Sequence, residues 1–150
     1  MTSEEGKLVI RRMKAEDVDA ISQIDHKLSG PRRVGAFVSL KSERFGGPLD
    51  MSIVAEVNGR VVGFIQAGLA YVDIPVTEVG IIQSIAVDPD YQRQGIATKL
   101  INTLLDNCYA GGVDTLRIAI DDRFVQLRNF FERRGFQRSH LVNYTKTFES

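Results

Sequence analysis

The sequence of 150 residues predicts a single-domain α/β fold built on a mixed, twisted sheet. Segments with strand-type alternation are interspersed with segments whose apolar residues recur every three or four positions. Asn58-Gly59, between two apolar runs, is the strongest hairpin signal, because both residues tolerate the positive φ angles of a type I′ turn. An apolar run ending at Val87 then enters a glycine-containing turn and a helix.

Two helices are expected before the main sheet. After a polar start at 1–6, expected to be frayed, a first strand covers 8–10 and a helix covers 15–28. The helix carries acidic residues in its first turn and ends at Gly30-Pro31. A second helix is expected from 33 to 45.

The later elements complete the order β-α-α-β-β-β-α-β-α-β-β. They are strands at 51–57, 60–71 and 78–87, a helix from 96 to 110, a strand at 115–120, a helix at 124–134, and strands beginning at 136 and covering 141–148. The chain shows no repeat or linker, so we predict one domain over residues 1–150.

The junction between the strand and the helix near the middle of the chain points to anion binding. Pro89 ends the strand, and Gly95 and Ala97 leave little side chain between the backbone and an approaching ligand. The first N–H groups of a helix lack acceptors within it, and the helix dipole adds positive charge there. Arg93 and Lys99 add mobile positive charge nearby. We therefore predict that this turn binds a phosphate group.

Composition limits the classes of partner and compartment. Nineteen basic residues balance nineteen acidic ones, so net charge gives no reason to expect nucleic acid or an anionic membrane as a partner. The one cysteine, Cys108, cannot form an internal disulfide, and its place on an apolar helix face predicts a core residue. No apolar N-terminal run is long enough for a signal peptide or a membrane span. We therefore expect a cytoplasmic protein.

The pattern Gln92-x-x-Gly95-x-Ala97 resembles the acyl-CoA pyrophosphate loop of the GNAT superfamily of N-acetyltransferases. The segment 129–136 resembles that family's Leu-Tyr-Glu-Lys-x-Gly-Phe segment, and the order of elements is that of the GNAT fold. The resemblance covers nearly the whole chain and is sharpest over 78–136. A plain strand-to-helix turn is the alternative reading of the loop. An ATP-binding P-loop is disfavoured because no Gly-Lys-Ser/Thr follows.

The resemblance implies acetyl-CoA as the acyl-donor cosubstrate. In that family the pantetheine arm pairs with the exposed edge of a splayed strand, here the backbone of Ile85, Ala86 and Val87. A free N–H near Ile85 or Ala86 would stabilise the oxyanion. The implied loop contacts are Gln92, Arg93, Gln94, Gly95, Ile96, Ala97 and Thr98.

Catalytic side chains depart from the family pattern. The family's usual proton donor is the tyrosine of the later segment, and Phe131 stands at that position. The candidate general base is Glu78, acting through water, with a solvated strand-end acid as the alternative. The candidate substitute donor is Tyr144, with ordinary strand packing as the alternative. An Asn and a Glu used in the family would fall at Phe124 and near Ala119, which disfavours the ribosomal-protein N-terminal acetyltransferases.

The acceptor site is less defined by the sequence. Gln83 can orient water or substrate but cannot take a proton. The fold's first two helices and late strands would supply lining residues, each of which is also an ordinary surface group. These candidates are Asp25, His26, Arg32, Arg33 and His140. No cluster of His, Cys and acidic residues has metal-ligand spacing, so we predict no metal.

The function that the resemblance implies is acetyl transfer from acetyl-CoA to a primary amine of a small molecule or a protein, by direct attack in a ternary complex. The alternative is a non-catalytic acyl-CoA-binding sensor or regulatory module, motivated by Phe131. A weaker alternative is an α/β protein that binds another phosphate ligand. A homodimer through a C-terminal edge strand is a further expectation.

Overall fold

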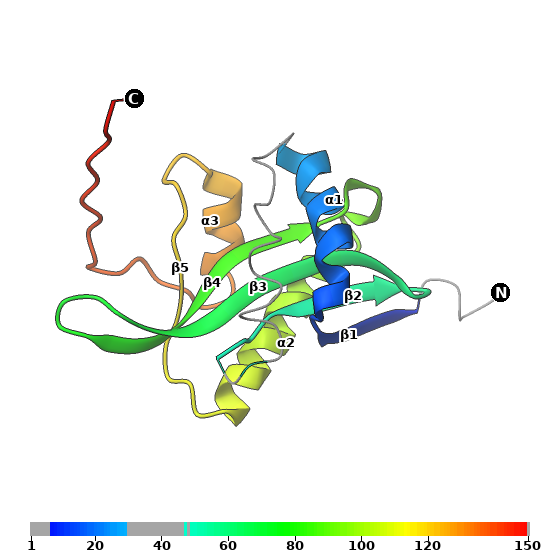
Figure 1. Ribbon diagram of the computed structural model, residues 1–150, viewed down its shortest axis with the longest axis horizontal. Coiled ribbons are helices and arrows are strands. Elements are labelled where there is room, and N and C mark those ends of the chain that lie inside the picture. Colours follow the sequence, from blue (N-terminus) through cyan, green and yellow to red (C-terminus); the bar gives the residue numbers. More distant parts are fainter. Residues whose placement is uncertain (1–6, 30–46, 48, 150) are drawn as a thin grey trace. The chain divides into compact units, whose positions relative to one another are not determined.

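The computed structural model describes residues 7–29, 47 and 49–149. Within these residues the centre is a five-stranded sheet with the order β1-β2-β3-β4-β5 (Figure 1). The strands are β1 (Leu8–Arg12), β2 (Ile53–Val57), β3 (Arg60–Val72), β4 (Thr77–Val87) and β5 (Leu116–Ile118). The first four are antiparallel neighbours, whereas β5 lies parallel to β4. The sheet is therefore mixed, as the sequence predicts.

Helices cover both faces of this sheet. The helical segments are η1 (Ala15–Asp17), α1 (Val18–Ser29), η3 (Pro89–Tyr91), α2 (Ile96–Ala110) and α3 (Val125–Glu132). Gly63 and Phe64 are neighbours in β3 and so point to opposite faces. A Cβ atom at Gly63 would lie 3.3 Å from Leu100 of α2, whereas Phe64 packs in a cluster with Ile21 of α1. Helices α1 and α2 therefore lie on opposite faces of the sheet (Figure 1).

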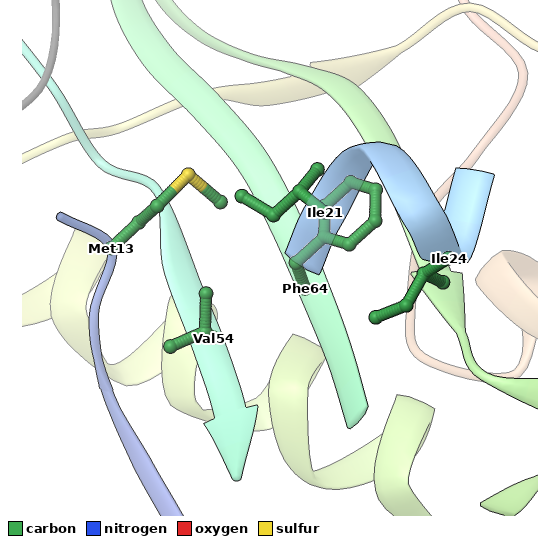
Figure 2. Close-up of a cluster of buried hydrophobic side chains, with 5 residues drawn as sticks. All are labelled: Met13, Ile21, Ile24, Val54 and Phe64. Atoms are coloured by element: carbon green, nitrogen blue, oxygen red, sulfur yellow. The ribbon is translucent and has the colours of Figure 1, made fainter. Parts of the chain in front are cut away.

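The core under α1 is a cluster of five apolar side chains. Figure 2 shows Phe64 of β3 beside Ile21 of α1, with Met13, Val54 and Ile24 around them. Each is 2% exposed or less. Burying a side chain of this size stabilises the fold by about 2 kcal/mol. The cluster thus fixes α1 to β2 and β3.

The hairpin between β2 and β3 confirms the turn expected from the sequence. Asn58 and Gly59 have φ angles of 51° and 78°, the positive values that a type I′ turn requires. The turn brings Val57 opposite Arg60 in the register of the two strands. Local turn chemistry alone was sufficient to place this connection.

The chain separates into two compact units, Met1–Ala119 and Ile120–Ser150. The first contains the sheet with α1 and α2, and the second contains α3 and the C-terminal segment. The α/β class with its mixed sheet is confirmed. The extent of one domain over 1–150 stays a prediction.

The C-terminal segment differs from the expectation. No strand forms over 136–149, although strands were expected to begin at 136 and to cover 141–148. The apolar side chains of Leu141, Val142, Tyr144 and Phe148 are 52%, 74%, 95% and 78% exposed. An alternating pattern becomes a strand only where a neighbouring strand completes its hydrogen bonds, so the pattern of the segment alone does not determine this element.

Other boundaries moved by small amounts. The first helix divides into the 3-10 turn η1 and α1, and β5 keeps only three residues. The second helix, expected over 33–45, lies outside the described residues. In the part of the chain that the structure describes, no helix is long and apolar enough to cross a membrane.

Candidate functional site

The strand β4 has neighbours on both sides for only part of its length. It pairs with β3 from Thr77 to Val87, but with β5 only from Gly80 to Ile82. Among the described residues no strand pairs with the other edge of β4 from Gln83 onward. A β-bulge lies at the same point, where the register with β3 shifts between Gln66 and Ala67. The second half of β4 therefore presents an open edge.

The register of β4 shows which backbone groups face this open edge. Asp88 donates its N–H to Val62 O of β3 at 2.7 Å. Hydrogen-bonded and non-hydrogen-bonded pairs alternate along an antiparallel ladder, so Ala86 also bonds β3, whereas Ile85 and Val87 point away from it. The Val87 carbonyl indeed accepts a hydrogen bond from Gln92 Nε2 at 3.1 Å. The N–H groups of Ile85 and Val87 thus line the open edge.

The open edge leads directly into the predicted phosphate-binding turn. Gly95 is the N-cap residue of α2, with φ 79° and no side-chain cap, and Arg93 also has a positive φ of 66°. The Gly95 carbonyl accepts the N–H of Lys99, so the helix starts at this point. The N–H groups of the first helical turn have no carbonyl acceptor within the helix. A turn without a side-chain cap leaves this helix end suited to an external anion.

The predicted loop residues lie together around this helix start. Gln92, Arg93, Gln94 and Gly95 are exposed, Ile96 is buried, and Ala97 and Thr98 are partly buried. Among the described residues, no heavy atom lies within 4 Å of a Cβ atom built at Gly95, apart from its chain neighbours. The space beside the turn is therefore open to a ligand. The side chains of Arg93 and Lys99 are exposed and can add positive charge.

A buried carboxylate anchors the turn to the rest of the protein. Asp88 is 2% exposed, and its Oδ1 accepts the N–H of Asp90 at 3.0 Å. Its Oδ2 lies 2.9 Å from Lys27 Nζ of α1 and 3.7 Å from an Arg60 nitrogen. Burial alone would raise the pKa of Asp88, but these hydrogen bonds and charges together lower it.

Neither Asp88 nor Lys27 was expected from the sequence to act at this site. The signal for Asp88 was present, because an Asp followed directly by Pro is typical of the cap of a helical turn. Lys27 carried no such signal. Its contact with Asp88 joins residues 61 positions apart, which only the fold brings together.

The candidate base Glu78 lies at the far end of β4. It faces Tyr71 across the β3–β4 ladder, and the Tyr71 hydroxyl donates to its Oε2 at 2.6 Å. This hydrogen bond raises the pKa of Tyr71. Seven residues of extended strand separate Glu78 from Ile85, a distance of roughly 20 Å. Both Tyr71 and Glu78 are exposed.

The other candidate side chains belong to different parts of the chain. Tyr144 is in the exposed C-terminal segment of the second unit, 95% exposed. Phe131 is 2% exposed and packs edge-to-face against Phe130 and Phe136, both at 5.1 Å between ring centroids. At this position the side chain packs between the two neighbouring phenylalanine rings. Gln83 is exposed beside the bulge.

The predicted lining of an acceptor site is described only in part. Asp25 is buried and His26 exposed on α1, and His140 is exposed in the second unit. Arg32 and Arg33 lie outside the described residues. Cys108 is buried in α2, and burial raises its pKa, which confirms a core residue. No group of three His, Cys, Asp or Glu residues in the described chain could hold a metal ion.

The open edge of β4 and the start of α2 together define the kind of ligand that this site can bind. An open strand edge can pair with an extended ligand that carries amide groups, as an added strand would. The helix start that follows can hold the negative charge of a phosphate group on the same ligand. The two features are continuous in the chain, from Ile85 to Thr98.

Comparisons with known proteins identify the family. The model of the acetyltransferase (GNAT) family matches residues 19–136. The chain therefore belongs to the GNAT family, which confirms the resemblance and the class of enzyme predicted from it.

Relatives and solved structures agree with this assignment. The uncharacterised N-acetyltransferase MJ1207 of Methanocaldococcus jannaschii is 32% identical over 94 residues, 62% of this chain and 42% of that protein, so the match spans less than half of it. The ribosomal protein bS18-alanine N-acetyltransferase of Escherichia coli strain K12 is 27% identical over 140 residues, 92% of this chain and 87% of that enzyme. The structure of the aminoglycoside N-acetyltransferase AAC(6')-Iy in complex with CoA has a TM-score of 0.83 at 16% identity, covering 98% of this chain and 99% of that chain. This last likeness is one of fold.

Proposed function

We propose that this protein transfers an acetyl group from acetyl-CoA to a primary amine of a small molecule or a protein, by direct attack in a ternary complex. The observation that carries the proposal is the continuity between the open edge of β4 and the uncapped start of α2. The family assignment supports it independently, since the family match includes both features.

The residues of the site fit the chemistry of acetyl-CoA. Its pantetheine arm carries amide groups, which the outward N–H groups of Ile85 and Val87 can bind in the manner of strand pairing. Its pyrophosphate is an anion suited to the N–H groups at the helix start, with Arg93 and Lys99 as nearby cations. Gln92 fixes the loop through its bond to the Val87 carbonyl.

The transfer step requires balanced movement of electrons and protons. The amine nitrogen attacks the thioester carbonyl carbon, a C–N bond forms, and the C–S bond breaks to release a thiolate. The nitrogen loses one proton, and the thiolate gains one. The N–H of Ile85 points outward from the ladder at mid-edge, where it would stabilise the negative charge on the carbonyl oxygen.

Side-chain proton carriers remain proposals. Glu78 is the proposed acceptor of the amine proton through water, but the strand separates it from Ile85 by roughly 20 Å, well beyond the reach of one bridging water. Tyr144 is the proposed proton donor to the thiolate. Direct exchange with water is the alternative for both steps, and positioning alone can supply much of the rate.

The chemical class of acceptor is supported by the relatives' own substrates. The E. coli relative is named for an alanine of ribosomal protein bS18, and AAC(6')-Iy for aminoglycosides. These acceptors share an amine and differ in size. A small-molecule amine and a protein amine therefore remain the two proposed classes. We also retain cytoplasmic localisation as a proposal.

A release assay tests the proposed function. The protein is incubated with acetyl-CoA and a panel of polyamines, aminoglycosides, amino acids and peptides with free N-termini, and free CoA thiol is measured against a control without acceptor. Acceptor-dependent thiol release is expected. Saturable acetyl-CoA binding without release by any acceptor would instead favour the non-catalytic sensor, for which Phe131 at the usual tyrosine position is the motivating observation.

A further inference from the structure

One carboxylate at the end of β4 joins three elements of the first unit. Asp88 donates its backbone N–H to β3, and its carbonyl accepts the N–H of Tyr91 at 2.8 Å. Its side chain caps η3 through Asp90 and pairs with Lys27 of α1. The residue therefore fixes the first turn of the loop against both the sheet and a helix.

The geometry makes Lys27 the principal counter-charge of this carboxylate. Its ammonium group is 2.9 Å from Asp88 Oδ2, at hydrogen-bond distance, whereas the Arg60 nitrogen is 3.7 Å away. The Asp88 side chain is 2% exposed and the Lys27 side chain is 41% exposed. A buried carboxylate that loses its partner keeps its desolvation cost, so it shifts to regain hydration or another partner. Such a shift would move the turn that Asp88 caps.

We propose that Lys27 and Asp88 are positioning residues for acetyl-CoA: their ion pair holds the phosphate-binding turn in register with α1. Neither residue needs to touch the ligand. Asp88 acts through the cap of η3, and η3 leads directly into Gln92 and the helix start at Gly95. The inference rests on the proposed function for the identity of the ligand.

The link also gives α1 a role beyond its core packing. Helix α1 contacts β3, β4 and η3, and its apolar face is held by the cluster in Figure 2. Lys27 lies near its C-terminal end, whereas Val18 begins the helix at its other end. A displacement of this end of α1 would therefore move the loop through the ion pair between Lys27 and Asp88.

The test compares two ion pairs that flank the same helix. Lys27→Met removes the charge but keeps the length of the side chain. Arg11→Met is the matched control, because Arg11 is 27% exposed and pairs with Asp17, whose side chain is 7% exposed, next to the start of α1. Both variants should lose stability, but only Lys27→Met should affect the turn. CoA and the phosphate-free pantetheine serve as probes in calorimetric titrations.

We expect Lys27→Met to weaken CoA binding roughly three- to tenfold, with Lys27→Arg close to wild type and Arg11→Met unchanged. Pantetheine binding should not change. Hydrogen exchange of the amides from Gln92 to Thr98 should accelerate in Lys27→Met and not in Arg11→Met. Asp88→Asn, which keeps an acceptor for Asp90, provides the same measurements if Lys27→Met does not fold.

Unchanged CoA affinity and loop exchange in a folded Lys27→Met or Asp88→Asn variant would overturn the inference. Equal losses in Arg11→Met would also overturn it, since they would show a general effect of stability. If wild-type protein and Lys27→Met bind CoA equally well, the inference fails but the proposed function is left intact. Wild-type protein that binds no CoA overturns both.

Discussion

At the scale of single residues, the backbone of β4 carries more of the proposed chemistry than any side chain. The outward N–H of Ile85 is set by the ladder with β3, so its direction follows from the register and not from residue type. The two candidate side chains are less well placed. Glu78 is bonded to Tyr71 at the exposed end of the hairpin, and Tyr144 is 95% exposed.

Substitution of Glu78 decides its role. If Glu78 is the general base, Glu78→Gln lowers kcat by about 100-fold or more. The hydrogen bond from Tyr71 can be kept by the amide oxygen, so stability should be nearly unchanged. The measurement is kcat over a pH series with an acceptor found in the release assay, and Tyr71→Phe is the control. A kcat within twofold of wild type at every pH would show that the proton leaves through water.

At the scale of elements, the sequence predicted the parts whose signals are local. Asn58-Gly59, the helix of α2 and the strand ending at Val87 all depend on neighbours in the chain, and all formed as expected. The open edge of β4 was anticipated only by resemblance, since pairing between strands is not local. The alternation at 141–148 likewise depends on a distant strand, and the segment carries no strand in the described residues.

The start of α2 provides the prediction at this scale. Gly95→Glu places bulk and negative charge beside the helix start, and we expect it to abolish CoA binding. Gly112→Glu is a matched control, because Gly112 also has a positive φ, 75° against 79°, and no heavy atom of the described chain within 4 Å of a Cβ. It lies at the other end of α2, roughly 22 Å away. Both variants should carry a similar backbone strain of about 1–2 kcal/mol.

Calorimetric titration with CoA measures the outcome. Loss of binding in Gly95→Glu with retention in Gly112→Glu supports the loop as the phosphate site. Retained affinity in Gly95→Glu would contradict this placement of the pyrophosphate. Thermal unfolding of both variants checks that their folds are equally intact.

At the scale of the whole molecule, two buried carboxylates make the stability of the fold depend on pH. Burial alone would raise the pKa values of Asp17 and Asp88, but hydrogen bonds and charges, mainly from Arg11 and Lys27, lower both below the ordinary 3.8. A lowered pKa in the folded state gives stability that is present above the ordinary pKa. This stability is lost as the pH falls through 3.8 toward the folded-state values.

We therefore expect these two groups to leave the free energy of unfolding constant from about pH 7 to about pH 5, and to lower it steeply below about pH 4. Asp88→Asn should be less stable near neutrality and should lose less stability on acidification. Urea unfolding at a series of pH values measures both effects. An acid slope in Asp88→Asn equal to that of wild type would show that Asp88 does not contribute.

A homodimer stays a prediction, which light scattering at several concentrations tests.

The most direct test of the acetyl-CoA site is an amide-resolved NMR titration of the protein with acetyl-CoA. We expect saturable shifts that are largest at the N–H groups of Ile85 and Val87 and across the loop from Arg93 to Ala97. The amides of β1 and of Gly112 should shift little. Absence of binding, or saturable shifts that leave both the edge of β4 and the start of α2 unchanged, would contradict an acetyl-CoA site at this strand edge and helix start.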